Sequence, residues 1–325
     1  MSHPDAERTQ AGSTWLHRYA VLVVLSTACL VFAGGLVTST GSGLAVPDWP
    51  LSYGQVMPPM VGGVLYEHGH RMIATLVGLL TIVLAVWLQR ADKRRWMRRL
   101  GWAALGLVVL QGVLGGLTVL YFLPISISVS HAGTAELFFA LVTALALFTS
   151  PRWNAPRVYD ERPAAVRFLP LATATAVVIY VQILLGALMR HTGAGLAIPD
   201  FPLAFGEIVP PLGDPAAAIH FAHRVGAVAV SGMSIWVLVR VLRAHGHQPE
   251  LRNPATLLAA LLAFQIALGA VTVLSGKAVF PTTLHVAVGA SMWATSVVLA
   301  LRARRHLATT EAETAPLVNV EEARA

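Results

Sequence analysis

The stretch TGSGLAVPDWPLSYGQVMPPM, residues 40–60, decides the fold, because a close copy, TGAGLAIPDFPLAFGEIVPPL, follows at residues 192–212. The two segments align without gaps and are identical at twelve of twenty-one positions. Chance does not produce a match of this length and quality. The sequence therefore predicts an internal duplication.

The similarity continues outward on both sides of this segment. The matched positions are Gly34 with Gly186, His70-Arg71 with His223-Arg224, Gln111 with Gln265, Gly115 with Gly269, Thr118 with Thr272, and His131 with His285. The offset is 152 residues at the first pair and 154 at the last. We therefore expect two copies of one unit, at residues 19–149 and 168–301.

The composition identifies the unit as a membrane bundle. The chain has 325 residues, 56% of them hydrophobic and only 12% charged, which is typical of an integral membrane protein. Apolar runs long enough to cross about 30 Å of hydrocarbon lie near residues 19–38, 67–88, 100–121, 127–149, 168–189, 218–241, 255–275 and 281–301. The expected fold is all-α, with eight transmembrane helices in two pseudo-twofold-related four-helix bundles.

Arginine and lysine residues predict the orientation. They concentrate after the second, fourth, sixth and eighth apolar runs, and such residues stay on the cytoplasmic side. Both termini are therefore expected in the cytoplasm, as residues 1–18 and a disordered tail at 302–325, with a cytoplasmic linker at 150–167. This topology explains the net charge of +7, so nucleic-acid binding is not expected. Because four crossings return the chain to its starting side, the repeats should share one orientation.

The repeated segments are expected to lie outside the membrane. Prolines such as Pro47 and Pro58 rule out a regular helix, and Trp49 and Tyr53 suit an ordered lid resting on the bundle. A simple packing linker is the alternative reading. Asp48 and Asp200 are expected to cap short helices in these loops.

Four histidines fall at one depth, near the outer ends of the even-numbered helices. They are His70 and His131 in the first half and His223 and His285 in the second. A single histidine in an apolar helix is usually a satisfied packing residue, but two matched pairs indicate a function. Each half offers too few further ligands for zinc, whereas two facing imidazoles suit the axial positions of a haem. The sequence predicts one haem site in each half.

Arg71 and Arg224 directly follow the first histidine of each pair. Their guanidinium groups could bind haem propionates, or they could extend to the membrane surface. Matched glycines allow either close helix packing, which we favour, or space for a flat macrocycle. The role of Gln111 and Gln265 stays open.

The halves differ at one polar position. Glu67 aligns with His220, so that a carboxylate stands in one half and an imidazole in the other. Glu67 lies three residues before His70, on the same helical face, and a carboxylate there suits proton transfer or stabilisation of positive charge. The asymmetry predicts chemistry in the first half and a permanent cofactor in the second, unless Glu67 is a surface carboxylate. The remaining histidines, His17, His68, His245, His247 and His306, are expected in loops or at the membrane interface.

Together these residues resemble the haem A synthase family over about residues 15–301. The resemblance rests on the paired TGSGLAVPDWP and TGAGLAIPDFP loops, on Glu67-x-x-His70-Arg71 and His220-x-x-His223-Arg224, and on the two later histidines. Members convert haem O to haem A by successive hydroxylations of a porphyrin methyl group to a formyl group, in support of terminal oxidase assembly. The chain resembles the branch that lacks cysteines in the first outer loop, which puts a thiol electron relay in doubt.

The resemblance also implies roles for the site residues. His70 and His131 would address the substrate haem O, His223 and His285 would ligate a haem b cofactor, and Glu67 would be needed for activity. It implies a prokaryotic plasma-membrane protein with haem sites near the outer face. A haem O synthase and an electron donor would be partners, and homo-oligomerisation stays open. Because a bis-histidine iron has no open position, either one N-terminal histidine leaves or oxidising equivalents arrive from elsewhere.

Two other functions compete with this one. A dihaem b-type electron-transfer cytochrome explains four histidines but not Glu67. A transporter built of parallel repeats would need an unwound site at midplane, and no helix-breaking proline lies there.

Overall fold

The computed structural model describes residues 4–155 and 168–307, and this part of the chain is almost entirely helical. The helices are α1 (Pro4–Ser39), α2 (Gly63–Ala91), α3 (Arg95–Leu120), α4 (Ile125–Thr149), α5 (Pro151–Asn154), α6 (Phe168–His191), η1 (Ala194–Leu196), α7 (Pro215–His245), α8 (Pro249–Leu274) and α9 (Val279–Leu307). Eight of them are long and apolar enough to span a membrane. The predicted all-α membrane fold with eight spans is confirmed.

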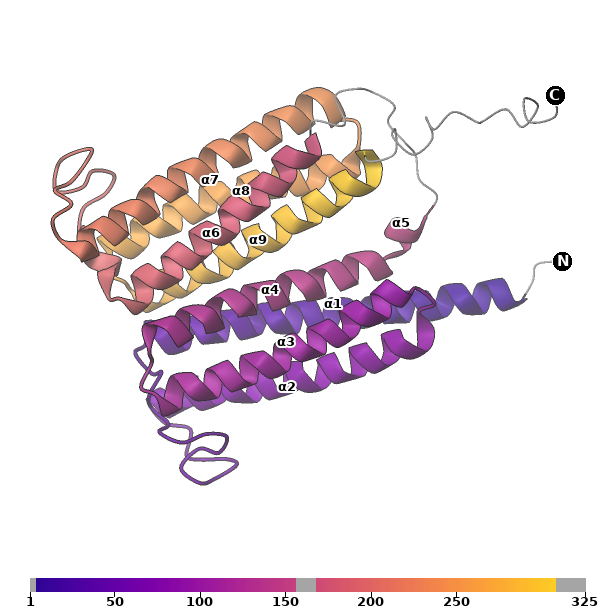
Figure 1. Ribbon diagram of the computed structural model, residues 1–325, viewed down its shortest axis with the longest axis horizontal. Helices are drawn as coiled ribbons and strands as arrows, with labels where there is room; N and C mark the ends of the chain where they lie inside the picture. The colour runs from indigo at the N-terminus through magenta and orange to yellow at the C-terminus, as the bar shows by residue number, and fades with distance from the viewer. Residues whose placement is uncertain (1–3, 156–167, 308–325) are drawn as a thin grey trace, which may run out of the picture.

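The helices form two groups of four (Figure 1). In the first, α1 packs on α2, α2 on α3, α3 on α4, and α4 closes the ring on α1; α6 to α9 repeat this order. The groups meet through α1 with α9, α4 with α6, and α4 with α9. These contacts are reciprocal, as a twofold relation requires, but the axis itself stays a prediction.

Burial separates the protein core from the membrane-facing surface. Leu84, Met97 and Leu145 are buried in the first group, and Phe168 and Leu251 in the second. Large apolar side chains such as Val228, which is 72% exposed, cover the outside. Such a surface is stable only against lipid.

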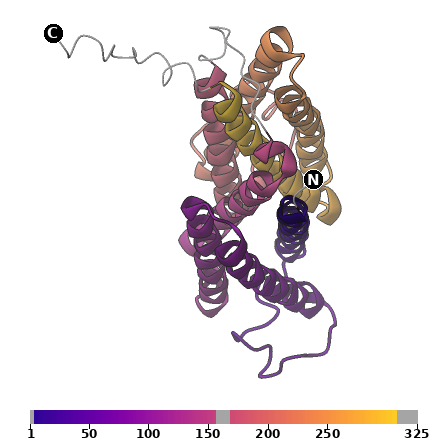
Figure 2. The ribbon, with the colours of Figure 1, turned by 90° about the vertical axis from the view of Figure 1, so that its right-hand side faces the viewer.

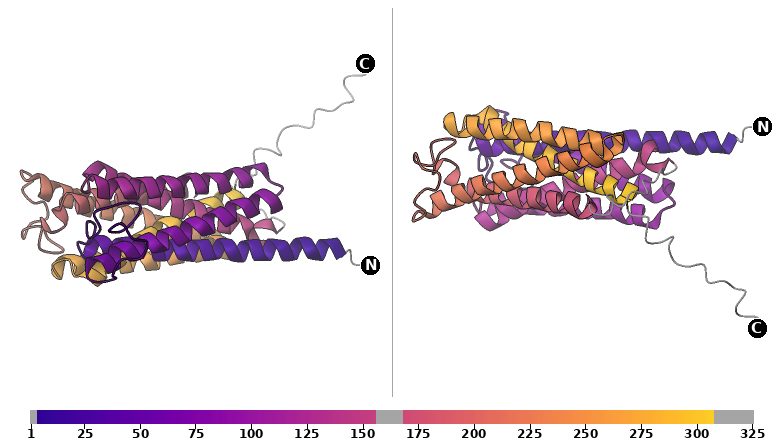
Figure 3. Two further views of the ribbon diagram at one scale, coloured as in Figure 1. Left: turned by 90° about the horizontal axis from the view of Figure 1, so that it is seen from below. Right: turned by 90° about the horizontal axis from the view of Figure 1, so that it is seen from above.

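The two long loops, residues 40–62 and 192–214, lie at the same end of the molecule, whereas α1 begins and α9 ends at the other (Figures 1 and 3). The end view in Figure 2 shows the group of α6 to α9 next to the group of α1 to α4. The described residues contain only two isolated β-bridges, Ser52–Gln55 and Ala204–Glu207, one in each long loop. Both loops therefore have the same local fold.

Several expected boundaries differ from the structure. The first helix begins at Pro4 instead of near residue 19, because extending an existing helix into water costs much less free energy than nucleating a new one. The expected linker contains the short helix α5, where the Ser150 side chain accepts a hydrogen bond from the Trp153 N–H. The rest of the linker, 156–167, and residues 308–325 of the expected tail lie outside the described residues.

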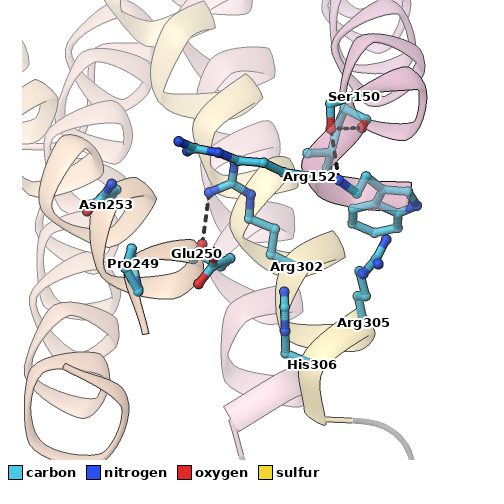
Figure 4. A pocket seen from close by; sticks show the side chains of 10 residues that line it. Ser150, Arg152, Pro249, Glu250, Asn253, Arg302, Arg305 and His306 are labelled. Carbon is cyan, nitrogen blue, oxygen red and sulfur yellow. Dashed lines mark hydrogen bonds between the residues drawn. The ribbon is translucent and has the colours of Figure 1, made fainter. Parts of the chain in front are cut away.

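A pocket opens between the two groups at the end away from the long loops (Figure 4). Arg152, Arg302 and Arg305 line it, and Arg302 donates a hydrogen bond of 3.0 Å to the carbonyl of Glu250. None of the four paired histidines reaches this pocket. It is therefore separate from the predicted haem sites.

Candidate functional site

Each long loop contains a tight turn held by an aspartate. Tyr53 and Gly54 have positive φ angles of 53° and 69°, and Phe205 and Gly206 have 56° and 77°. Asp48 accepts hydrogen bonds of 2.7 and 2.8 Å from the Tyr53 and Gly54 N–H groups, and Asp200 does the same for the second turn. The expectation that these aspartates cap short helices is wrong, because their carboxylates close turns instead.

The backbone donors also change the acidity of both aspartates. The hydrogen bond from Gly54, with that from Tyr53, holds the pKa of Asp48 below its ordinary value. Gly206 and Phe205 lower the pKa of Asp200 in the same way. Both carboxylates therefore stay ionised, and the turns stay closed, at neutral pH.

Arg71 and Arg224 bind the long loops to the helices. Arg71 donates to the carbonyls of Asp48 and Leu51, at 2.8 and 2.9 Å. Arg224 donates to the matched carbonyls of Asp200 and Leu203, at 2.6 and 2.7 Å. The loops therefore rest on the bundle in both halves, and their role as lids over a ligand stays a prediction. Propionate binding by these arginines stays a proposal.

Glu67 and His220 occupy matched, buried positions. Glu67 is 4% exposed, and its carboxylate accepts from the Val46 N–H at 2.8 Å and from Arg71 at 2.6 Å. His220 is 3% exposed, and its Nδ1 lies 3.2 Å from the matched Ile198 N–H. The reading of Glu67 as a surface carboxylate is wrong, because the first long loop covers it. Of the two matched arginines, Arg71 and Arg224, only Arg71 forms an ion pair with a carboxylate among the described residues.

Some of the remaining histidines are not where they were expected. His68 is buried in α2, and its Nδ1 lies 2.8 Å from the Ser52 hydroxyl in the first long loop. His245 is buried against the Phe168 ring. Neither residue lies in a loop, because both belong to helices and are covered by tertiary packing, whereas their expected depth at the membrane interface stays a prediction. His17 lies in α1 with its Nδ1 3.0 Å from the Ala146 carbonyl, His247 follows α7, and His306 lies in the last turn of α9.

Each paired histidine stacks over a glycine of the neighbouring helix. A Cβ atom placed on Gly34, Gly115, Gly186 or Gly269 would lie 3.1, 3.4, 2.9 or 3.2 Å from Cε1 of His70, His131, His223 or His285, respectively. An added Cβ would force the His223 ring to move and would require small shifts of His70 and His285, whereas at His131 it would approach ordinary van der Waals contact. These glycines therefore provide the space that the imidazoles fill.

The rings of the second pair are neighbours. The centroids of His223 and His285 lie 6.5 Å apart with the rings inclined by 63°. Two metal–nitrogen bonds of about 2 Å each, with the ring centres about 1 Å further out, span about 6 Å. The second pair thus has the spacing of two axial ligands to one iron.

The nitrogen atoms also fit a metal ligand. Nδ1 of His70, His131 and His285 is buried without a hydrogen-bond partner, so each of these rings has a nitrogen that no protein group satisfies. No group of three or more metal-binding side chains occurs among the described residues. Two-ligand sites of this kind suit a haem, whose porphyrin supplies the other four nitrogens.

Three polar residues near these sites were not predicted, of which Glu136 is buried and the other two are half-buried. Gln182 in α6 bonds His223, and its signal in the sequence is an amide within an apolar run where the first half has Leu30. Glu136 in α4 is 5% exposed and lies where α4 meets α6 and α9. Arg190 in α6 donates to Ser39 of α1. Of the two glutamines left open, Gln111 donates to Thr134 within its bundle, and Gln265 packs against Gly289.

Fold and site together define a class: a polytopic helical membrane protein with two copies of a four-helix bundle and an imidazole pair in each. The chain belongs to the cytochrome oxidase assembly protein family COX15-CtaA, whose model matches residues 17–64 and 62–297.

Named relatives agree with this membership. The chain is 34% identical to a haem A synthase of Symbiobacterium thermophilum, over 82% of this chain and 90% of that protein. It is 30% identical to a haem A synthase of Halalkalibacterium halodurans with the same coverage. A haem A synthase of Sphingopyxis alaskensis is 29% identical over 94% of this chain and 96% of its own length. The similarity therefore covers both bundles.

Proposed function

We propose that this protein is a membrane haem A synthase, an oxidoreductase that converts a methyl group of haem O to a formyl group by successive hydroxylations. Family membership and the names of the relatives support this function. The structural observation that carries it is a buried carboxylate, Glu67, that is ion-paired with Arg71 beside the first histidine pair, where the second pair has the imidazole of His220. An enzyme with one substrate site and one cofactor site needs the two sites to differ in their chemical groups.

The two pairs take different haems in this proposal. His223 and His285 hold a haem b cofactor, and His70 and His131 hold haem O. A bound haem supplies the one-electron chemistry of its iron. The protein contributes the imidazoles, the glycines that admit them, and the long loops that cover each site. Arg71 and Arg224 remain candidates for the haem carboxylates.

Glu67 is the proposed catalytic residue. Its carboxylate is buried beneath the first long loop and is bonded to Arg71 and to the Val46 N–H. These partners keep it fixed and water-poor, one helical turn from His70. In that position it can stabilise positive charge that develops on the porphyrin methyl group, or accept a proton from it.

The protein is a multi-pass membrane protein, and we place it in the plasma membrane of a prokaryote with both termini cytoplasmic. The arginine distribution supports this orientation, which puts both haem sites near the outer face. A haem O synthase and an electron donor are the expected partners.

Co-expression with a haem O synthase, followed by chromatography of the extracted haems, tests the function. We expect haem A with the intact protein and none with an empty vector. His285→Ala should lose the bound haem b and its visible absorption band while the protein still inserts in the membrane. A protein that carries haem b but makes no haem A from supplied haem O would instead be the rival dihaem electron-transfer cytochrome.

A further inference from the structure

The four histidine rings do not all face the same neighbour. Nδ1 of His70, His131 and His285 is buried without a hydrogen-bond partner. The residue four positions before the glycine under each of these rings is Leu30, Gln111 and Gln265, respectively. At His223 the corresponding residue is Gln182, and its side-chain amide lies beside Nδ1 of the ring. Only one of the four imidazoles therefore has a side-chain partner of this kind among the described residues.

The Gln182 amide contacts His223 twice. Its Nε2 donates a 2.8 Å hydrogen bond to the His223 backbone carbonyl and lies 3.1 Å from the ring Nδ1. Its Oε1 is buried without a partner. An amide can present N–H or C=O by turning its last bond, so the side chain can instead accept the Nδ1 proton through Oε1, in which case it gives up its bond to the His223 carbonyl. That proton position leaves Nε2 to the iron, as in other metal-bound histidines.

The space for this amide comes from a second substitution between the halves. A Cβ on Gly226 of α7 would overlap Oε1 of Gln182. By the offsets that match Gly34 with Gly186 and His70 with His223, Gln182 corresponds to Leu30 and Gly226 to Ile73. The first half thus has two apolar side chains where the second has an amide and a gap.

We propose that Gln182 is a positioning residue that locks His223 as a permanent axial ligand in the second bundle. This inference rests on the proposed function. Gln182 and Gly226 act as a unit, because either a shorter amide or a larger residue 226 breaks the contact with the ring.

The test uses full-length protein with His70→Ala and His131→Ala, so that only the second bundle holds haem, purified from cells supplied with haem precursors. Carbon monoxide is added to the reduced protein, and haem transfer to excess apomyoglobin is timed. This parent should not bind carbon monoxide, because both axial positions are filled. Adding Gln182→Met, which keeps the volume, should create a carbon monoxide-dependent Soret shift and speed haem transfer by about fivefold to tenfold, as expected for lost hydrogen bonds.

Gly226→Ala is the second variant, because it displaces the amide without removing it and answers the question if Gln182→Met does not fold. It should give the same Soret shift. Gln111→Met is the matched control, since that amide bonds Thr134 and not a ring, and it should behave as the parent. A haem-loaded Gln182→Met or Gly226→Ala protein that refuses carbon monoxide and transfers haem at the parent rate would overturn this inference alone. A parent without haem would overturn the proposed cofactor site as well.

Discussion

At the scale of single residues, the buried Glu67 carboxylate combines a structural and a chemical role. One oxygen accepts the Val46 N–H and the other pairs with Arg71. The matched His220 also faces a loop N–H, so a loop-holding function exists in both halves. Only the negative charge is unique to the first half.

Glu67→Gln separates these roles, because glutamine keeps an oxygen for Val46 and removes the charge. We expect haem A production to fall by about a hundredfold or more, the usual effect of losing an acid–base group, while haem b content stays normal. Chromatography of extracted haems measures both quantities. Normal haem A from Glu67→Gln would show that the carboxylate only supports the loop.

The glycines under the imidazoles are a second residue-scale feature. Gly186→Ala should reduce haem b content severalfold, because the new Cβ would lie 2.9 Å from Cε1 of His223. Gly78→Ala in α2 is the control, since nothing lies within 4 Å of its Cβ position. The control should keep its haem and gain up to about 1 kcal/mol of helix stability. Haem-to-protein ratios and thermal melting of both variants check this prediction.

At the scale of elements, the long loops are rigid parts of the site. Trp49 of the first loop packs on α3 so closely that a Cβ on Gly116 would lie 2.7 Å from its indole ring. In the second half the matched residues are Phe201 and Ala270, a smaller ring facing a larger helix residue. The larger indole thus faces a glycine in the first half, and the smaller phenyl ring faces an alanine in the second. This exchange of volume keeps each loop packed on its helix.

The aspartate turns make the loops sensitive to acid. The Asp48 pKa is lowered in the folded protein, so its stabilising contribution is complete above the unfolded value of about 4 and is lost as the pH falls through the folded pKa. We expect the Tyr53 and Gly54 amides to be protected from hydrogen exchange at pH 7.

Asp48→Ala should remove that protection at pH 7, with no further acid effect at this turn. Hydrogen exchange measured by mass spectrometry follows both loops at once. The Asp200 turn provides the internal control, because its own carboxylate is intact and its protection should not change. Protection of Tyr53 and Gly54 that survives the substitution would contradict a closing role for Asp48.

At the scale of the whole molecule, the two bundles form one body through α1, α4, α6 and α9. The Trp293 indole N–H donates a 3.0 Å hydrogen bond to the Glu136 carbonyl, and its ring lies 5.1 Å from that of Tyr180. Farther along, Arg190 reaches from α6 to the Gly35 carbonyl in α1 at 3.0 Å. These contacts join the halves close to both histidine pairs.

Trp293→Phe should lower the unfolding free energy of the detergent-solubilised protein by about 1 kcal/mol, the net value of one hydrogen bond, because phenylalanine keeps a ring but not the donor. Trp236→Phe, at a 56% exposed position, is the control and should be neutral. Thermal melting monitored by circular dichroism compares them. Equal melting of the two variants would show that the bond between the bundles contributes nothing.

The sequence by itself determined the duplication, the eight spans and the four paired histidines. Apolar length, basic residues and repeated motifs are local properties, and they survive whatever the helices do in three dimensions. The repeat also identified Glu67 as the unequal position, because a mismatch within a duplication is visible without coordinates.

Only the tertiary structure decided which side chains meet. Arg71 and Arg224 bind the long loops, tertiary packing buries His68 and His245, and Gln182 contacts His223 from another helix. All these contacts join residues from different elements. Helical period places a residue on a face of its own helix, but the partner across the gap depends on how neighbouring helices are rotated and spaced. For this reason the histidines could be predicted, and the groups that hold them could not.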